Sequence, residues 1–205
     1  TMPTSTPLPE GVLFRDDFNR ELQPGWEWEN ENAINWMLTD DGWLSIVGQS
    51  EYLLIHETQN NLLWTSLPEG DFVITVKLKG RPFENFHQAS IFIYEDPENY
   101  ISINHGYCDQ PQPTCAGGEG FYMEYKTGGA WGAYNAPADS ETVYLRLEQN
   151  ENQIIGYYAT EEGNWSRLGR FGNYFDFTRV GIGVSNAGAT STLIGYYDWF
   201  EISVP

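Results

Sequence analysis

The sequence predicts an all-β protein, an antiparallel β-sandwich of the jelly-roll type. Short segments of alternating apolar and polar residues recur along the chain, turn-forming residues separate them, and no long segment keeps a helical period. The chain of 205 residues is about twice the size of an immunoglobulin domain. It also lacks a Cys…Trp…Cys framework, which favours the jelly roll over an immunoglobulin-like fold.

The first ten residues differ in composition from the rest. Residues 1–10 read TMPTSTPLPE, a Thr/Pro-rich tract that favours extended backbone and has little apolar surface to bury. We therefore predict a linker over 1–10 and a single sandwich domain over 11–205. A Thr/Pro tract beside a domain usually joins it to another module, so we expect a neighbouring domain in a longer, secreted protein.

The predicted strands follow one another at short intervals after the linker. Each is rich in β-branched and aromatic residues, as strands are. Their ranges are 43–48, 52–57, 72–80, 89–95, 100–107, 121–129, 142–150, 153–160, 179–186 and 196–204. Turn-prone residues separate them at 40–42, 96–99, 128–129, 149–152 and 162–164.

The hairpin predicted over residues 86–107 has two different faces. Ile91 and Ile93 share one face with Ala89, and Ile101 and Ile103 meet them after the turn. The opposite face is polar and aromatic at once, with Gln88, Ser90, Phe92, Tyr94, Tyr100, Ser102 and Asn104. Amides, hydroxyls and rings on a rigid sheet suit a neutral, hydroxyl-rich ligand such as a sugar.

Two further strands and one loop extend this interpretation. Opposite their apolar stripes, the strands at 142–150 and 121–129 carry polar and aromatic side chains, and Trp131 lies in the glycine-rich stretch GGAWGAYN. If these strands neighbour the hairpin, their side chains converge on one surface. The predicted ligand-binding residues are Gln88, Tyr94, Asn104, Tyr122, Glu124, Trp131 and Arg146. The alternative is a solvated face with cross-strand Glu/Arg and Tyr pairs.

The charge of the chain excludes some partners. Ten Lys and Arg against 29 Asp and Glu give a formal net charge of −19, which repels nucleic-acid phosphates and anionic membrane surfaces. No apolar run reaches the roughly 18 residues that a membrane span needs. We therefore expect neither nucleic-acid binding nor membrane insertion.

The two cysteines and two of the aspartates suggest structural cross-links. Cys108 and Cys115 bracket a short loop and can form a local disulfide, which predicts an oxidising, secreted or extracellular location. Asp17 and Asp198 come together if the two chain ends pair, and their carboxylates suit a structural Ca²⁺. Otherwise the two aspartates are turn and edge-capping residues.

Several short motifs carry a family resemblance. They are FRDDF (14–18), GWEW (25–28), WMLT (36–39), GWL (42–44), GDFVI (70–74), FHQAS (86–90), VYLRL (143–147) and YDWF (197–200). The chain resembles the concanavalin A-like domains appended to family 43 β-xylosidases. This resemblance implies a lectin/glucanase-type fold with a concave sheet, in a superfamily where structural calcium is frequent. The cysteine-containing insertion at 107–120 departs from the pattern.

Three functions remain open. The first hypothesis is a non-catalytic carbohydrate-binding or carbohydrate-associated module, with a polysaccharide or oligosaccharide on the concave face. The second is a glycanase or polysaccharide lyase of the same fold, although the E-x-D-x-x-E run of the resembling glycanases is missing and His56, His87 and His105 do not cluster in sequence. The third is a structural domain that packs on a catalytic neighbour through its aromatic residues.

Overall fold

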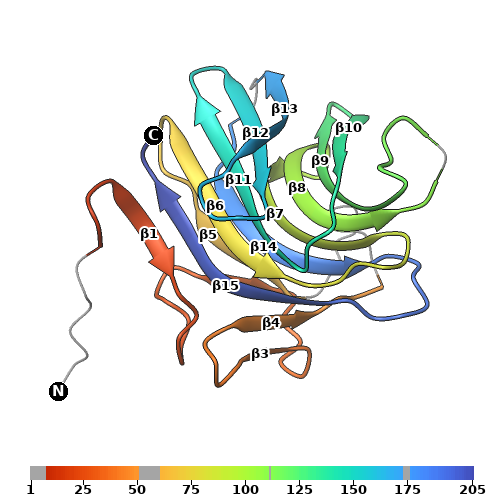
Figure 1. The fold of residues 1–205 in the computed structure, drawn as a ribbon. Helices are drawn as coiled ribbons and strands as arrows, with labels where there is room; N and C mark the ends of the chain where they lie inside the picture. Colours follow the sequence, from red (N-terminus) through yellow and green to blue (C-terminus); the bar gives the residue numbers. More distant parts are fainter. Residues whose placement is uncertain (1–7, 51–60, 111, 173–175) are drawn as a thin grey trace.

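A computed structural model describes residues 8–50, 61–110, 112–172 and 176–205, and in them the protein is a sandwich of two antiparallel sheets (Figure 1). Sheet A has the order β13-β12-β11-β6-β15-β4-β3, with β1 paired to β15, and sheet B has the order β10-β9-β8-β7-β14-β5-β2. The predicted fold class is confirmed. The strand predicted at 52–57 and residues 1–7 of the predicted linker lie outside the described residues.

Most of the longer strands coincide with alternating segments of the sequence. In sheet A they are β1 (Val12–Asp16), β3 (Trp36–Leu38), β4 (Leu44–Val47), β6 (Phe72–Lys79), β11 (Thr142–Asn150), β12 (Gln153–Ala159), β13 (Ser166–Gly172) and β15 (Ile194–Ser203). In sheet B they are β2 (Glu27–Glu29), β5 (Leu62–Ser66), β7 (His87–Asp96), β8 (Asn99–Cys108), β9 (Gly118–Thr127), β10 (Ala130–Pro137) and β14 (Arg179–Asn186).

Tight turns join consecutive strands at the positions that the sequence marks. Gly128 and Gly129 connect β9 to β10 with φ angles of 52° and 81°, which residues with a Cβ adopt at a cost. Residues 97–98 connect β7 to β8, and 151–152 connect β11 to β12. These short turns fix the register of each hairpin and therefore decide which side chains face outward.

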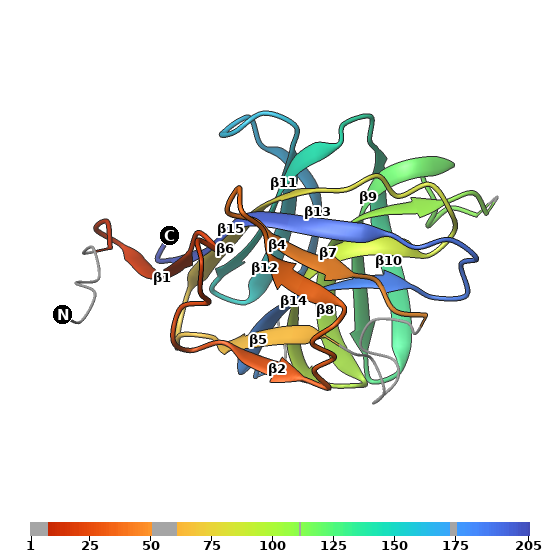
Figure 2. The same cartoon turned by 90° about the horizontal axis from the view of Figure 1, so that it is seen from below.

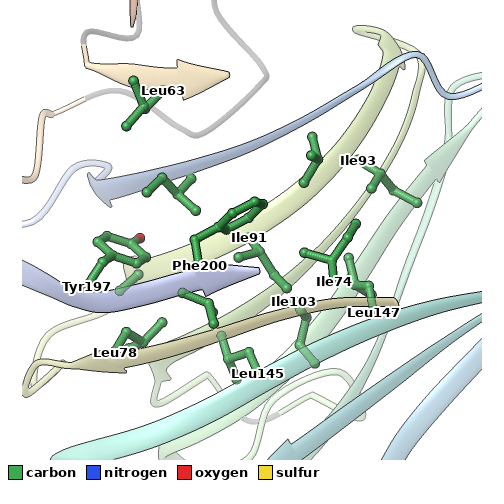
Figure 3. Packing of buried hydrophobic residues seen from close by; sticks show 14 of the residues in the cluster. Leu63, Ile74, Leu78, Ile91, Ile93, Ile103, Leu145, Leu147, Tyr197 and Phe200 are labelled. Atoms are coloured by element: carbon green, nitrogen blue, oxygen red, sulfur yellow. The ribbon is translucent and has the colours of Figure 1, made fainter. Parts of the chain in front are cut away.

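The core lies between the two sheets (Figure 3). Ile91 and Ile103 of sheet B face Ile74, Leu145 and Phe200 of sheet A, and each of these side chains is fully buried. The apolar face predicted for the 86–107 hairpin is thus the inner face of sheet B. Because successive residues of a strand alternate, the polar residues of the same hairpin lie on the outer face of that sheet.

Tyr197 joins the two sheets through the core. It comes from β15 in sheet A and is fully buried. Its hydroxyl accepts a hydrogen bond from the Ser90 N–H at 3.1 Å and donates to the Gly183 carbonyl at 2.8 Å. Burial raises the pKa of this phenol, so it stays a neutral donor. Sheet A thereby holds β7 and β14 in place.

The first and last strands lie side by side. β1 pairs with β15 in the register Asp16 opposite Phe200, and Figure 2 shows β1 on the same side of the sandwich as the C-terminus. None of the described residues forms a helix long and apolar enough to cross a membrane.

Candidate functional site

The outer face of sheet B holds most of the predicted ligand-binding residues. Ser90 pairs with Asn104, and Asn104 pairs with Tyr122 across β7, β8 and β9. In the next row Ser102 lies between Phe92 and Glu124. We call the set Gln88, Ser90, Ser102, Asn104, Tyr122 and Glu124 the sheet B polar group.

This face is less open than the sequence suggests. Asn104 is 0% exposed and Tyr122 is 4% exposed. Gln88, Tyr94 and Glu124 keep intermediate exposure. The polar face predicted to bind a sugar is therefore a mostly buried layer, of which only some side chains reach solvent.

Glu124 forms a bridge across the central strand of this group. Its Oε2 atom accepts hydrogen bonds from Gln88 Nε2 at 2.9 Å and from Asn104 Nδ2 at 2.6 Å. Gln88 lies on β7 and Glu124 on β9, so their bond passes over β8 at Asn104. Burial raises the pKa of the Glu124 carboxyl, and the two amide bonds oppose that rise.

Aromatic residues form one end of the face. Trp64 packs edge-on against Phe92 at 4.7 Å and lies 5.3 Å from Tyr94, measured between ring centroids. The Arg179 guanidinium lies 4.0 Å from the Trp64 ring centre and forms an ion pair with Glu29 at 3.0 Å. Tyr94, a predicted ligand residue, belongs to this cluster, whereas sequence reasoning missed Trp64 and Arg179.

The cysteine loop covers the other end. The predicted disulfide between Cys108 and Cys115 is confirmed, with their Cα atoms 5.6 Å apart. Within the loop region the Tyr122 hydroxyl donates to the Gly118 carbonyl at 3.0 Å. Asn135 Nδ2 of β10 donates to the Pro113 carbonyl at 3.0 Å. The loop therefore closes the Tyr122 side of the sheet B polar group.

Trp131 lies at the edge of the same face. It is part of strand β10, which corrects its predicted place in a mobile loop. It pairs with Lys126 of β9 and is 51% exposed. An exposed indole at a sheet edge is available for ligand contact.

Arg146 lies on the other side of the sandwich, which corrects its predicted convergence with Gln88 and Glu124. Its strand β11 pairs with β6 and β12 in sheet A. The guanidinium lies 4.3 Å from the Trp165 ring centre, pairs with Glu148 at 3.2 Å and donates to Thr75 Oγ1 at 3.3 Å. Its charge is thus paired with a carboxylate of the same strand.

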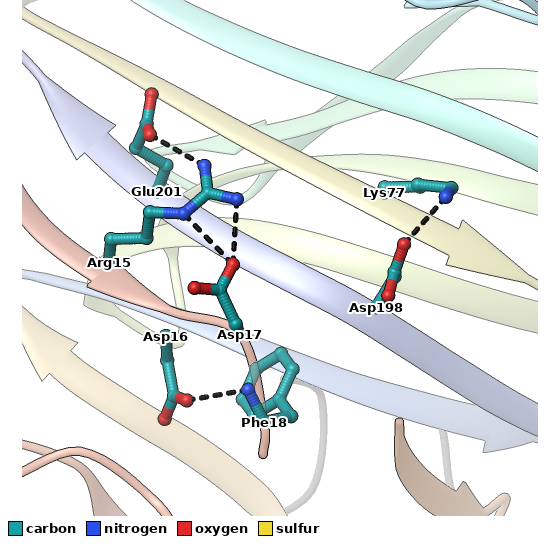
Figure 4. A network of polar contacts seen from close by, with 7 residues as sticks. All are labelled: Arg15, Asp16, Asp17, Phe18, Lys77, Asp198 and Glu201. Carbon is teal, nitrogen blue, oxygen red and sulfur yellow. Dashed lines mark hydrogen bonds and ion pairs between the residues drawn. The ribbon is translucent and has the colours of Figure 1, made fainter. Parts of the chain in front are cut away.

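The carboxylates of Asp17 and Asp198 do not fit the expected calcium site. Figure 4 shows them in separate ion pairs, Asp17 with Arg15 at 2.7 Å and Asp198 with Lys77 at 2.6 Å. No group of three or more His, Cys, Asp or Glu within the described ranges is arranged to hold a metal ion.

The neighbouring Asp16 has a role that sequence reasoning missed. It is 1% exposed and accepts hydrogen bonds from Phe18 N at 2.7 Å, Gln23 N at 2.8 Å and Trp26 Nε1 at 2.8 Å. Burial raises its carboxyl pKa despite these donors. Asp16 thus organises the loop after β1.

The described histidines offer no catalytic base. His87 and His105 are both fully buried, and His56 lies outside the described residues. His87 accepts at Nδ1 from Phe83 N at 3.3 Å, so its proton is on Nε2, toward the Ser191 carbonyl. In that tautomer it cannot take a proton from the Ser191 hydroxyl, although Glu84 also bonds this serine.

Comparison with known proteins identifies a family. Residues 15–203 match the family described as "Beta xylosidase C-terminal Concanavalin A-like domain". No curated protein matches the sequence significantly.

Solved structures share the fold at low sequence identity. The GH43 protein BlXynB of Bacillus licheniformis, as its K247S mutant, superimposes with a TM-score of 0.82 at 20% identity, over 98% of this chain and 41% of that chain. The Bacteroides ovatus protein called Xyloglucan PUL GH43B gives 0.76 at 16% identity, over 99% and 41%. A Bacillus licheniformis β-glucanase gives 0.65 at 14% identity, over 96% and 100%. The chain thus spans less than half the length of these two GH43 chains.

Proposed function

Since the chain belongs to the family of β-xylosidase C-terminal concanavalin A-like domains, we propose that it is a non-catalytic accessory module of a secreted, multidomain glycoside hydrolase. In this proposal it binds a polysaccharide or oligosaccharide at the outer face of sheet B. The Thr/Pro tract and the disulfide support a secreted protein, and the length of the GH43 relatives supports a catalytic neighbour.

The observation that carries the proposal is the isolation of Glu124. It is the only carboxylate among the outward residues of the 88–94, 100–104, 122–126 and 131–135 segments, read from their register. Glycosidases commonly use two carboxyl groups on either side of the scissile bond. A single carboxylate that amide groups hold in place suits hydrogen bonding to a sugar better than bond cleavage.

Affinity electrophoresis on xylan, arabinan, β-glucans and fructans tests the binding. We expect retardation on at least one polymer, at about micromolar to millimolar strength. Trp131→Ala should weaken it, because this indole is exposed beside the polar group. Trp165→Ala, directly before β13 and over Arg146 of sheet A, is the matched control and should not. If no polymer lowers the mobility of the protein relative to a gel without polymer, the proposal is contradicted.

A product assay distinguishes a glycanase or lyase from a non-catalytic binding module. Screens for reducing sugars and for unsaturated products should find no turnover. If hydrolysis appears and Glu124→Gln abolishes it, the module is an enzyme and the non-catalytic assignment is wrong.

A second candidate function uses the outer face of sheet A. There Lys79 Nζ lies 4.1 Å from the Trp43 ring centre and Arg15 Cζ lies 4.9 Å from that of Trp199. Met37 and Ile194 on the same face are 58% and 37% exposed. Ordered cations, rings and exposed apolar side chains favour a docking surface for the catalytic neighbour.

Hydrogen exchange tests this second candidate. Amides of β4 and β15 should exchange more slowly in the longer protein than in the isolated domain if the neighbour docks there. Equal exchange on this face would remove the candidate and leave the carbohydrate proposal untouched.

A further inference from the structure

The sheet B polar group contains hydrogen-bonding atoms without partners. In the described part of the chain, the buried side-chain atoms with no hydrogen bond are Ser90 Oγ, Asn104 Oδ1, Trp64 Nε1 and His105 Nδ1. Three of these four belong to the outer face of sheet B, and Ser90 and Asn104 are direct cross-strand neighbours. Buried polar atoms are nearly always paired, so three on one face require an explanation.

The hydrogen bond to Glu124 explains why the oxygen of the Asn104 amide, Oδ1, has no partner. An ionised carboxylate only accepts hydrogen bonds, so the Asn104 amide must turn its nitrogen toward Glu124. This orientation directs Asn104 Oδ1 away from the bridge. Both hydrogen bonds recorded for Glu124 end on Oε2, so its second oxygen keeps acceptor capacity.

The unpaired atoms define the chemistry of a partner. Asn104 Oδ1 and the Glu124 carboxylate need donors, whereas the Trp64 N–H needs an acceptor and the Ser90 hydroxyl can do either. Neighbouring hydroxyl groups of a sugar both donate and accept. The Glu124 charge disfavours an anionic sugar.

The dimensions of the group limit the ligand. Its proposed binding atoms, on Ser90, Asn104 and Glu124, lie on three neighbouring strands and in two adjacent rows of residues, roughly 10 Å by 7 Å from the usual strand spacings. The loop that Cys108 and Cys115 close lies on the Tyr122 side, and the Trp64 cluster lies on the other. This footprint suits one sugar residue rather than a long stretch of polysaccharide.

We propose that the Gln88–Glu124 bridge opens to admit one uncharged terminal sugar, at a chain end or a branch. Its neighbouring hydroxyls then pair with Asn104 Oδ1, Ser90 Oγ and the Glu124 carboxylate. The inference rests on the proposed carbohydrate binding and adds that the module recognises chain ends. Internal sugar residues of a polysaccharide do not enter this site.

Titration calorimetry with oligosaccharides of increasing length tests chain-end recognition. The ligands are the mono- to hexasaccharides of the xylose, arabinose and glucose series. We expect affinity to reach its plateau by the disaccharide, with the hexasaccharide within about threefold of it. An affinity that rises tenfold or more up to the hexasaccharide would overturn chain-end recognition and leave the proposed function standing. No binding of any oligosaccharide or polymer would overturn both.

Variants test the assigned atoms. Ser90→Ala should reduce saccharide affinity tenfold or more without lowering the melting temperature, because the hydroxyl it removes lacks a partner. Asn104→Ala should reduce the affinity as much but also lower the melting temperature, because it removes the amide that donates to Glu124. Ser45→Ala on the outer face of sheet A is the matched control and should bind as the unmodified protein does. Unchanged affinity in Ser90→Ala would overturn the assignment. Stabilisation by CaCl₂ that Asn104→Ala abolishes, without sugar binding, would instead identify a cation site.

Discussion

On the outer face of sheet A the cations contact their partners within the fold, whereas on the outer face of sheet B polar atoms remain without them. Arg146 lies over Trp165 and is bonded to Glu148 and Thr75. Ser90 Oγ and Asn104 Oδ1 are fully enclosed by protein and have no hydrogen bond. The two faces belong to one sandwich and share one core.

This difference indicates where a small polar ligand gains most. A ligand on sheet A has to break existing ion pairs, and it gains little in exchange. A ligand on sheet B supplies hydrogen bonds that the fold leaves unmade, and each unmade bond in a buried site costs about 1–3 kcal/mol. We therefore propose ligand binding on sheet B and contact with a neighbouring domain on sheet A.

Tyr197→Phe should have the largest effect on stability, because this residue connects the two sheets. The change removes the hydroxyl that bonds Ser90 N and the Gly183 carbonyl. We expect the free energy of unfolding to fall by about 1–3 kcal/mol, as measured by urea denaturation. A loss below about 0.5 kcal/mol would show that sheet A does not hold β7 in place.

Arg146→Ala should destabilise the protein without affecting saccharide binding. The guanidinium is partly exposed, so the loss of its ring contact and ion pair should cost about 1 kcal/mol. Arg167→Ala, at an exposed position of β13, is the control and should change stability by less than about 0.5 kcal/mol. Weakened sugar binding in Arg146→Ala would contradict the proposal that the ligand binds on sheet B and not on sheet A.

Glu124→Gln should remove a pH dependence that comes from sheet B. Burial raises the folded-state pKa of Glu124 above its ordinary value of 4.5. The folded state then holds this proton more tightly than the unfolded state, so stability falls as pH rises from 4.5 through the folded pKa. Denaturation midpoints between pH 4 and 8 should fall less steeply in Glu124→Gln. Parallel curves for the two proteins would contradict the raised pKa.

Ser90→Ala should have the smallest effect on the free protein. Its hydroxyl has no partner to lose, so the free energy of unfolding should stay within about 0.5 kcal/mol or rise slightly. Thermal melting without ligand measures it. A loss above about 1 kcal/mol would mean that this hydroxyl is paired in solution.

The fold was predictable where strands are long and alternate. The inner stripe of Ile91, Ile93, Ile101 and Ile103 fixed the orientation of the central hairpin, and the structure confirms it. The three-residue strands β2 and β3 are too short to show a period. Strand β13, with the sequence SRLGRFG, has no apolar alternation, so only its tertiary partners reveal it.

The candidate site was predictable within one hairpin and less so across the sheet. Alternation placed Gln88 and Asn104 on one face, but nothing in the sequence indicates which sheet a distant strand joins. Arg146 was therefore assigned to the wrong face, and Trp64 was missed. Alternation along β1 does distinguish Asp16 from Asp17. Asp16 lies on the same face of the strand as Phe14, and Phe14 packs on the core.

The most direct test of this division is an NMR titration that follows the indole N–H signals of ¹⁵N-labelled protein. The ligand is a short saccharide from the series above. We predict that the signals of Trp64 and Trp131 shift with saturation, while those of Trp165 and Trp199 stay unchanged. Saturable shifts at Trp165 and Trp199, with Trp64 unaffected, would contradict the assignment of the ligand site to sheet B.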